Sequence, residues 1–252
     1  MKKIYLGFVI ALLAICTSCQ FSENIYINED GTGKVSFNMD GSELMEMMGE
    51  EMAKSNDSKT IDSTISFKEL LKGQEDSISK LPKADQEKLR QLEDFKMHMV
   101  MDAEKKKMNM DMFADFKTVN ELQDMFSAMN KAGKMDKRNN QDTQANSNPM
   151  AALGSDGVSE VKYSYNGNMF KRKTVIIDKA KLLSLKDSLG QAKMMFAASD
   201  YTLNYHFPRK IKSVSLENAK INEDGKSFTV AVNFMEYITN PELLNVEVEL
   251  EN

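Results

Sequence analysis

The stretch FKMHMVMD (residues 95–102), AEKK (103–106), KMNMDMFADF (107–116) decides the fold of this chain. Methionine occupies every second position on both sides of AEKK, which is the two-residue period of a β-strand. Symmetric closure of a hairpin around AEKK predicts five cross-strand pairs, which are Met101–Met108, Met99–Met110, Met97–Met112, Asp102–Lys107 and His98–Asp111. The sequence therefore predicts an antiparallel hairpin with methionine on one face and charged residues on the other.

Three further hairpins are predicted at Asp-Gly and Asn-Gly pairs, the strongest short-range turn signals. These turns are centred on Asp30-Gly31, Asn166-Gly167 and Asp224-Gly225. For the first, a three-residue loop with a left-handed glycine keeps one apolar face. The expected pairs are Ile27–Val35 and Ile25–Phe37 in the first hairpin, Tyr163–Phe170 in the second, and Ile221–Phe228 with Ala219–Val230 in the third.

Helical spacing of apolar residues appears between these hairpins. It predicts helices over residues 42–53, 67–92 with a break at Pro82, 118–131 and 179–196, and further strands over 201–207 and 246–250. The spacing typical of βαβ units is missing, so the strands are expected to pair antiparallel. The predicted class is α+β, with an antiparallel sheet built from hairpins and helices packed on one face.

The N-terminus has the composition of an export signal. Two lysines precede an apolar run over residues 4–15, which is too short to span a bilayer that needs about 20 residues. Small residues precede Cys19 as they precede the modified cysteine of a bacterial lipoprotein, which indicates a signal over residues 1–18 and lipidation of Cys19. The alternatives are a secretory signal cleaved elsewhere and an N-terminal membrane anchor.

A polar segment, residues 133–159, divides the mature chain into parts at 19–132 and 160–252. This segment is rich in Asn, Gln and Ser, and such a composition indicates a flexible linker or long loop. Both parts are expected to be α+β, and one sheet shared between them is an open alternative.

Composition excludes several classes of protein. The chain of 252 residues holds 33 Lys and Arg against 38 Asp and Glu, and the two lysines of the signal are lost with it, leaving 31 − 38 = −7. An acidic chain does not suit nucleic acid, which is bound by basic surfaces. Two cysteines and two histidines are too few for a disulfide scaffold or a zinc ribbon.

The methionine face carries three competing interpretations. Paired thioethers can bind a soft metal such as Cu(I), but ordinary core packing is the commoner role of methionine. The third interpretation is a deformable groove that binds a lipid or a peptide. The residues of the candidate groove are Met97, Met99, Met101, Met108, Met110 and Met112. We expect no cofactor and no metal, and His98 and His206 are interpreted as surface residues because no nucleophile of recognisable context accompanies them.

Several segments together resemble LppM-type bacterial lipoprotein domains. The first is the lipobox, which is the group of small residues before Cys19 together with Cys19 itself. The others are residues 23–33 with their Asp-Gly turn, and residues 201–208 followed by 211–214 and the Asp224-Gly225 hairpin. The methionine-rich residues 95–129 are also similar to small lipoproteins of Bacteroidetes. These resemblances imply an α+β envelope module, with an apolar ligand cavity as one option, and no catalytic residue.

The sequence thus favours a non-enzymatic protein of the bacterial cell envelope, anchored in the membrane through Cys19, most plausibly in the outer membrane. Its domain is expected to bind a partner protein or an apolar ligand such as a lipid. Two alternatives remain, a hydrolase whose site is not recognised and a structural or assembly factor of the envelope. No G-x-S-x-G, P-loop or HExxH motif is present to favour an enzyme.

Overall fold

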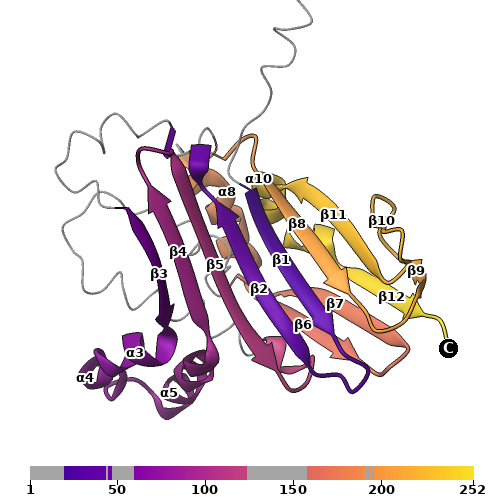
Figure 1. The fold of residues 1–252 in the computed structure, drawn as a ribbon, viewed down its shortest axis with the longest axis horizontal. Coiled ribbons are helices and arrows are strands. Elements are labelled where there is room, and N and C mark those ends of the chain that lie inside the picture. The colour runs from indigo at the N-terminus through magenta and orange to yellow at the C-terminus, as the bar shows by residue number, and fades with distance from the viewer. Residues whose placement is uncertain (1–19, 44, 47–59, 124–157, 191–192, 194–195) are drawn as a thin grey trace, which may run out of the picture.

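The computed structural model describes residues 20–43, 45–46, 60–123, 158–190, 193 and 196–252. Within these residues the chain forms an eight-stranded sheet and a four-stranded sheet, which lie one behind the other (Figure 1). The predicted signal 1–18, the lipidation residue Cys19 and the predicted linker up to residue 157 lie outside the described residues.

The large sheet has the strand order β10-β11-β8-β1-β2-β5-β4-β3. Its strands are β1 (Gln20–Ile27), β2 (Gly33–Asp40), β3 (Ile61–Ser66), β4 (Lys96–Asp102), β5 (Lys107–Phe116), β8 (Asp200–His206), β10 (Lys220–Ile221) and β11 (Ser227–Asn233). All neighbours pair antiparallel except β1 and β8, which are parallel. This pair joins strands from both sides of the polar segment into one sheet.

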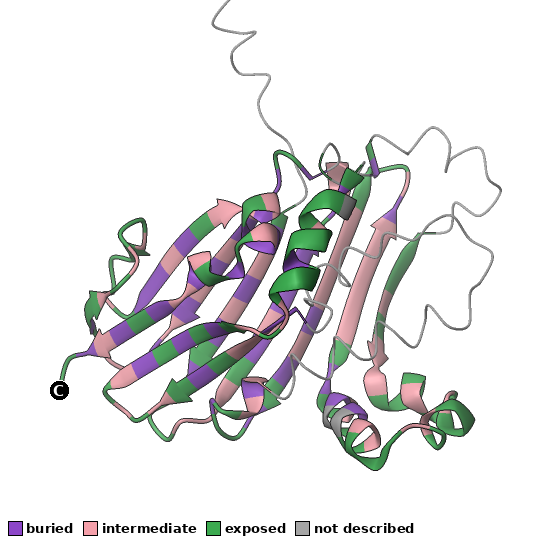
Figure 2. Ribbon diagram, turned by 180° about the vertical axis from the view of Figure 1, so that it is seen from behind, coloured by how far each residue is buried: buried purple, intermediate pink, exposed green. Residues whose placement is uncertain are grey.

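The small sheet covers only one part of the large sheet. Its order is β6 (Ser159–Tyr165), β7 (Met169–Ile176), β12 (Val246–Leu250) and β9 (Ile211–Val214). Buried side chains of β1 and β8 meet those of β6, β7 and β12 in a single hydrophobic core. Strands β5, β4 and β3 extend sideways beyond the small sheet (Figure 2).

The helices form two groups. One group lies on the side of the large sheet that faces the small sheet, and the other lies at one end of the large sheet (Figures 1 and 2). They are α3 (Phe67–Lys72), α4 (Glu75–Ile78), α5 (Lys83–Arg90), the 3-10 helix η1 (Gln91–Asp94), α8 (Lys179–Ser188), α10 (Phe234–Thr239) and the 3-10 helix η2 (Pro241–Leu244). Helices α8 and α10 lie beside the small sheet, and α3 to α5 lie at one end of β3 and β4 (Figures 1 and 2). The α+β prediction is confirmed.

The predicted helices differ from the structure in length. The helix expected over 67–92 is divided into α3, α4, α5 and η1, because Gly73 ends α3 and Pro82 precedes α5. Helix α8 begins where predicted, and Asp178 caps it by accepting a hydrogen bond from the Lys181 amide at 2.9 Å. Of the helix expected over 42–53, residues 42–43 and 45–46 are described, and they are helical. Of the helix expected over 118–131, residues 118–123 are described; 118–120 form a bend and a turn, and the helix begins at residue 121.

The β4–β5 hairpin has the register that the alternation of methionine predicts. Met97 pairs with Met112, Met99 with Met110, Met101 with Met108, and on the other face His98 pairs with Asp111. The Asp224-Gly225 hairpin also has the predicted Ile221–Phe228 pair. Both predictions are confirmed because a symmetric loop and one continuous apolar face leave few alternative registers.

The predicted register of the β1–β2 hairpin is wrong by two residues. Ile25 pairs with Val35, and Ile27 pairs with Gly33. The connection is tighter than expected, because five residues (28–32) separate Ile27 from its partner where the predicted Ile27–Val35 pair requires seven, and it includes Gly31 at φ +81°. A Cβ atom at Gly33 would lie 2.3 Å from the Cζ of Phe116, so only glycine fits beneath this ring, and that contact fixes the register.

The predicted register of the β6–β7 hairpin is also wrong by two residues. Tyr165 pairs with Phe170, and Tyr163 pairs with Arg172. The connection is a four-residue loop in which the Asn166 side chain accepts hydrogen bonds from the amides of Asn168 and Met169. Arg209 also donates to the carbonyl oxygen of Gly167, so tertiary contacts favour the longer loop over a two-residue turn.

Candidate functional site

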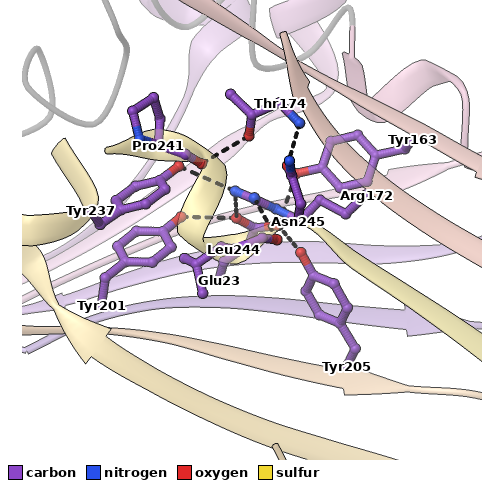
Figure 3. Close-up of polar contacts among 10 residues, drawn as sticks. All are labelled: Glu23, Tyr163, Arg172, Thr174, Tyr201, Tyr205, Tyr237, Pro241, Leu244 and Asn245. Atoms are coloured by element: carbon purple, nitrogen blue, oxygen red, sulfur yellow. Dashed lines mark hydrogen bonds and ion pairs between the residues drawn. The ribbon is translucent and has the colours of Figure 1, made fainter. Parts of the chain in front are cut away.

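A carboxylate lies at the centre of the interface between the two sheets. Glu23 occupies the core-facing side of β1, between Phe21 and Ile25, and its side chain is 0% exposed. A buried charge is stable only when it is paired and hydrogen-bonded. The groups that surround Glu23 come from strands of both sheets (Figure 3).

Three tyrosine hydroxyls donate to this carboxylate. Tyr163 of β6 donates to Oε1 at 2.9 Å and Tyr201 of β8 donates to Oε2 at 2.8 Å. Tyr205, four residues further along β8, donates to Oε1 as well. Because Tyr163 belongs to the small sheet and the other two to the large sheet, Glu23 joins the two layers.

Arg172 of β7 provides the counter-charge. Its Nη2 lies 3.5 Å from Oε2 of Glu23 and donates to the Tyr237 hydroxyl at 3.1 Å. Its Nη1 donates to the carbonyl oxygen of Leu244 at 3.1 Å, while Nε has no hydrogen-bond partner within the described part of the chain. The guanidinium therefore connects β7 to α10 and η2 as well as to β1.

Burial determines the ionisation of this cluster. It raises the pKa of the Tyr163, Tyr201 and Tyr205 hydroxyls well above the ordinary value, and the negative charge of Glu23 adds to the effect. For Arg172, burial acts to lower the pKa, but Glu23 and the nearby tyrosines hold it above its ordinary value. The tyrosines thus stay neutral and Arg172 stays charged.

The sequence analysis did not identify this cluster, which we call the Glu23 network and define as Glu23, Arg172, Tyr163, Tyr201, Tyr205 and Tyr237. One signal was present. Glu23 and Arg172 each occupy a position that alternation assigns to the apolar face, next to Ile25 and Phe170 respectively. All members are buried, with at most 7% of any of them exposed, so the network is closed to solvent. Its geometry suits the joining of two sheets.

The candidate groove of the sequence analysis occupies the part of the sheet beyond the small sheet. Its six methionines lie on the core-facing side of β4 and β5, in line with Phe37 and Met39 of β2. Met112 is buried and packs in the core, and Met108 and Met110 pack partly against it. Met97, Met99 and Met101 are half-buried and are not members of the core cluster. The structure thus brings all six together in one ladder, in which the β5 methionines contact the core cluster and the β4 methionines lie outside it.

The opposite face of the large sheet is polar. Thr229 donates to Asn204 at 2.9 Å, Asn204 donates to Asn24 at 2.9 Å, and the row continues through Asn38 to Asp111. Burial raises the pKa of Asp111, although Lys34 and His98 act in the opposite direction. The side chains of this row therefore form hydrogen bonds with one another.

The two histidines lie on this polar face. His98 Nε2 is 2.9 Å from Asp62 of β3, whose side chain is 72% exposed. His206 stacks on Tyr26 with ring centroids 4.2 Å apart, and burial lowers its pKa. Both residues are half-buried surface groups, as the sequence predicts, and neither lies on the methionine side of the sheet.

A shallow pocket of about 480 Å³ lies between α8 and α10, away from the methionine ladder. It is lined by Lys186, Leu189, Lys193, Ala197, Met235, Glu236 and Thr239. Among the described residues, no three His, Cys, Asp or Glu side chains are grouped so that they could hold a metal ion. In the same residues, no helix has the length and apolar character needed to cross a bilayer.

Comparison with known proteins gives one similar structure. No protein-family model matches the sequence, and no curated protein matches it. The folded domain of LppM from Mycobacterium tuberculosis, determined by NMR, is similar with a TM-score of 0.42 and 9% sequence identity, over 94% of this chain and 94% of that chain.

Proposed function

We propose that this protein is a non-enzymatic lipoprotein of the bacterial cell envelope, anchored through a lipidated Cys19 in the outer membrane. We further propose that its methionine ladder binds an apolar ligand or an apolar segment of a partner protein. The ladder is Met97, Met99, Met101, Met108, Met110 and Met112, and no cofactor is required for this function.

The observation that carries the binding proposal is the partial exposure of the ladder. Five of the six methionines are half-buried, although they occupy the face of the sheet that is otherwise covered by the small sheet. A row of unbranched thioether side chains can adapt its shape to different apolar partners. Contiguous apolar surface of this kind on a soluble domain is characteristic of binding sites.

The anchor proposal is supported by the position of Cys19 next to the fold. The apolar run over residues 4–15 and the small residues before Cys19 form the motif, and β1 begins at Gln20, directly after it. A signal sequence that ends where the folded domain begins is the arrangement expected for removal of residues 1–18.

Binding is tested by titrating the purified full-length lipoprotein with a fluorescent fatty-acid analogue. The variant Met99→Gln/Met110→Gln keeps the length of both side chains but replaces each thioether with an amide, so we expect its Kd to rise by about tenfold, or 1.4 kcal/mol. Val100→Gln, on the opposite face of β4, is the matched control and should bind like the parent. Equal affinity in all three proteins would refute the binding site.

The anchor is tested by metabolic labelling with radioactive palmitate. The parent should incorporate label and fractionate with the outer membrane, whereas Cys19→Ala should incorporate none and lose this fractionation. An unlabelled parent would overturn the lipoprotein assignment. Label in Cys19→Ala would show that a residue other than Cys19 carries the lipid.

A further inference from the structure

The fold leaves no tether between Cys19 and the large sheet. Gln20, the next residue, is already paired with Asp40 of β2 on one side and with Asp200 of β8 on the other. One residue of extended chain spans at most about 3.6 Å. A lipid on Cys19 therefore holds the end of a central strand, and with it the whole end of the sheet, close to the bilayer.

The β4–β5 turn projects furthest at this end of the sheet among the described strands. Asp40 pairs with Asn109, so Asn109 lies in the same cross-strand row as Gln20. The strands continue to the Asp102–Lys107 pair, about 7 Å beyond that row at 3.3–3.4 Å per residue, before the turn closes. Figure 1 shows the start of β1, the end of β2 and this turn at the same end of the molecule.

The turn carries three successive exposed lysines. Lys105 donates to Asp102 and Lys106 to Glu46, at 2.9 and 2.8 Å, and the two lysine side chains remain 79% and 57% exposed. An ammonium has three donors, so Lys105, which donates to Asp102, retains donors for a phosphate oxygen. Lys107 is exposed and makes no ion pair within the described ranges.

The pocket between α8 and α10 lies near the same end. Its Ala197 precedes the first residue of β8 by three positions, and its Met235 follows the last residue of β11 by two. Asp200 and Asn233, the two strand ends, pair with each other. Lys186 and Lys193 contribute cations to the lining, while Leu189, Ala197 and Met235 contribute apolar surface and Glu236 a carboxylate.

We propose that this end of the domain is a membrane-contacting surface that rests on the headgroups of the bilayer in which Cys19 is anchored. The 105–107 turn and the α8–α10 pocket face the lipid phosphates, and the opposite end, with the Asn222–Ser227 turn, points away from the membrane. The inference rests on the proposed lipidation and adds a fixed orientation to it. The mature chain is acidic overall, so the anchor supplies the attachment and the lysines supply local contacts.

The experiment uses two single-cysteine probes on the full-length lipoprotein, where acylation blocks Cys19. Glu104→Cys labels the β4–β5 turn and Glu223→Cys labels the far turn, and both replace an exposed glutamate in a turn. Each protein is labelled with an environment-sensitive fluorophore and reconstituted in phosphatidylethanolamine–phosphatidylglycerol vesicles containing a headgroup spin-labelled lipid. We expect several-fold stronger quenching at position 104 than at position 223.

A third protein, with a long flexible glycine–serine segment between Cys19 and Gln20, serves as the control for the missing tether. In it, the difference between the two probes should disappear. Equal quenching at both positions in the parent, with the protein retained on the vesicles, would overturn the contact surface and leave the anchor intact. Loss of retention on the vesicles would overturn the anchor and the contact surface together.

Discussion

Glu23 and Arg172 form an ion pair in which neither side chain is exposed to solvent, and the two residues belong to different sheets. Their 3.5 Å contact is supported by tyrosine hydroxyls on the carboxylate and by a backbone carbonyl on the guanidinium. Removal of one partner from such a pair leaves an unpaired buried charge, which costs more than the pair itself contributes. The junction between the two sheets is therefore sensitive to the loss of either partner.

Arg172→Met should lower the free energy of unfolding by about 3–5 kcal/mol, because the Glu23 charge is left buried without a partner. Lys171→Met is the matched control on the same strand. Lys171 pairs with Glu247 at 2.9 Å, but the side chains are 47% and 57% exposed, so the expected loss is below about 1 kcal/mol. Urea denaturation of both variants measures the difference.

The double variant Glu23→Leu/Arg172→Met should recover part of the stability lost in Arg172→Met, since neither charge remains. Equal losses for Arg172→Met and Lys171→Met would contradict the account of the Glu23 network. A double variant less stable than either single variant would contradict it as well.

The tyrosines of the network should make stability fall at alkaline pH. Burial raises the pKa of Tyr163, Tyr201 and Tyr205 well above the ordinary value of 10.0 for a tyrosine hydroxyl, so the folded protein retains protons that the unfolded chain releases. The contribution of these tyrosines to the free energy of unfolding is fully present below about pH 10. It is lost as the pH rises above the tyrosine pKa of the unfolded chain and towards the raised pKa of the folded protein. Near-ultraviolet difference absorbance should show these hydroxyls ionising only as the protein unfolds. Their ionisation before any loss of structure would refute the prediction.

Gly33 should tolerate no side chain. A Cβ there would lie 2.0 Å from the carbonyl oxygen of Tyr26 and 2.3 Å from Cζ of Phe116, and overpacking of this kind costs about 1–3 kcal/mol. Gly73→Ala is the control, because its Cβ would lie 3.7 Å from its nearest neighbour, the Leu70 carbonyl oxygen, which is an ordinary van der Waals contact. In thermal unfolding, the melting temperature of Gly33→Ala should be well below that of the parent, and the melting temperature of Gly73→Ala should be close to it. A similar melting temperature for both variants would show that the register does not depend on Gly33.

The β4–β5 hairpin shows what the sequence predicts well. Alternating methionines and the flanking Asp102–Lys107 pair define one face and one register, and the structure has both. In contrast, the β1–β2 register depends on the contact between Gly33 and Phe116, which are far apart in the sequence. Local turn rules contain no information about such a contact.

Long-range pairing explains the other features that the sequence did not predict. The parallel β1–β8 pair joins segments about 180 residues apart, and the Glu23–Tyr201 hydrogen bond spans 178 residues. A glutamate within a strand is normally assigned to the solvent face. Alternation with Phe21 and Ile25 places Glu23 on the apolar face instead, but the distant residues that pair with it are identified only from the structure. The six methionines, in contrast, could be grouped from local alternation alone.

The measurement that tests the central proposal most directly is native mass spectrometry of the full-length lipoprotein, extracted from membranes under mild conditions. The parent and Val100→Gln should each retain a bound apolar ligand as a defined excess mass, and Met99→Gln/Met110→Gln should lose it while keeping the mass of the Cys19 lipid. A parent without any such ligand, or equal retention by the paired methionine variant, would contradict the account.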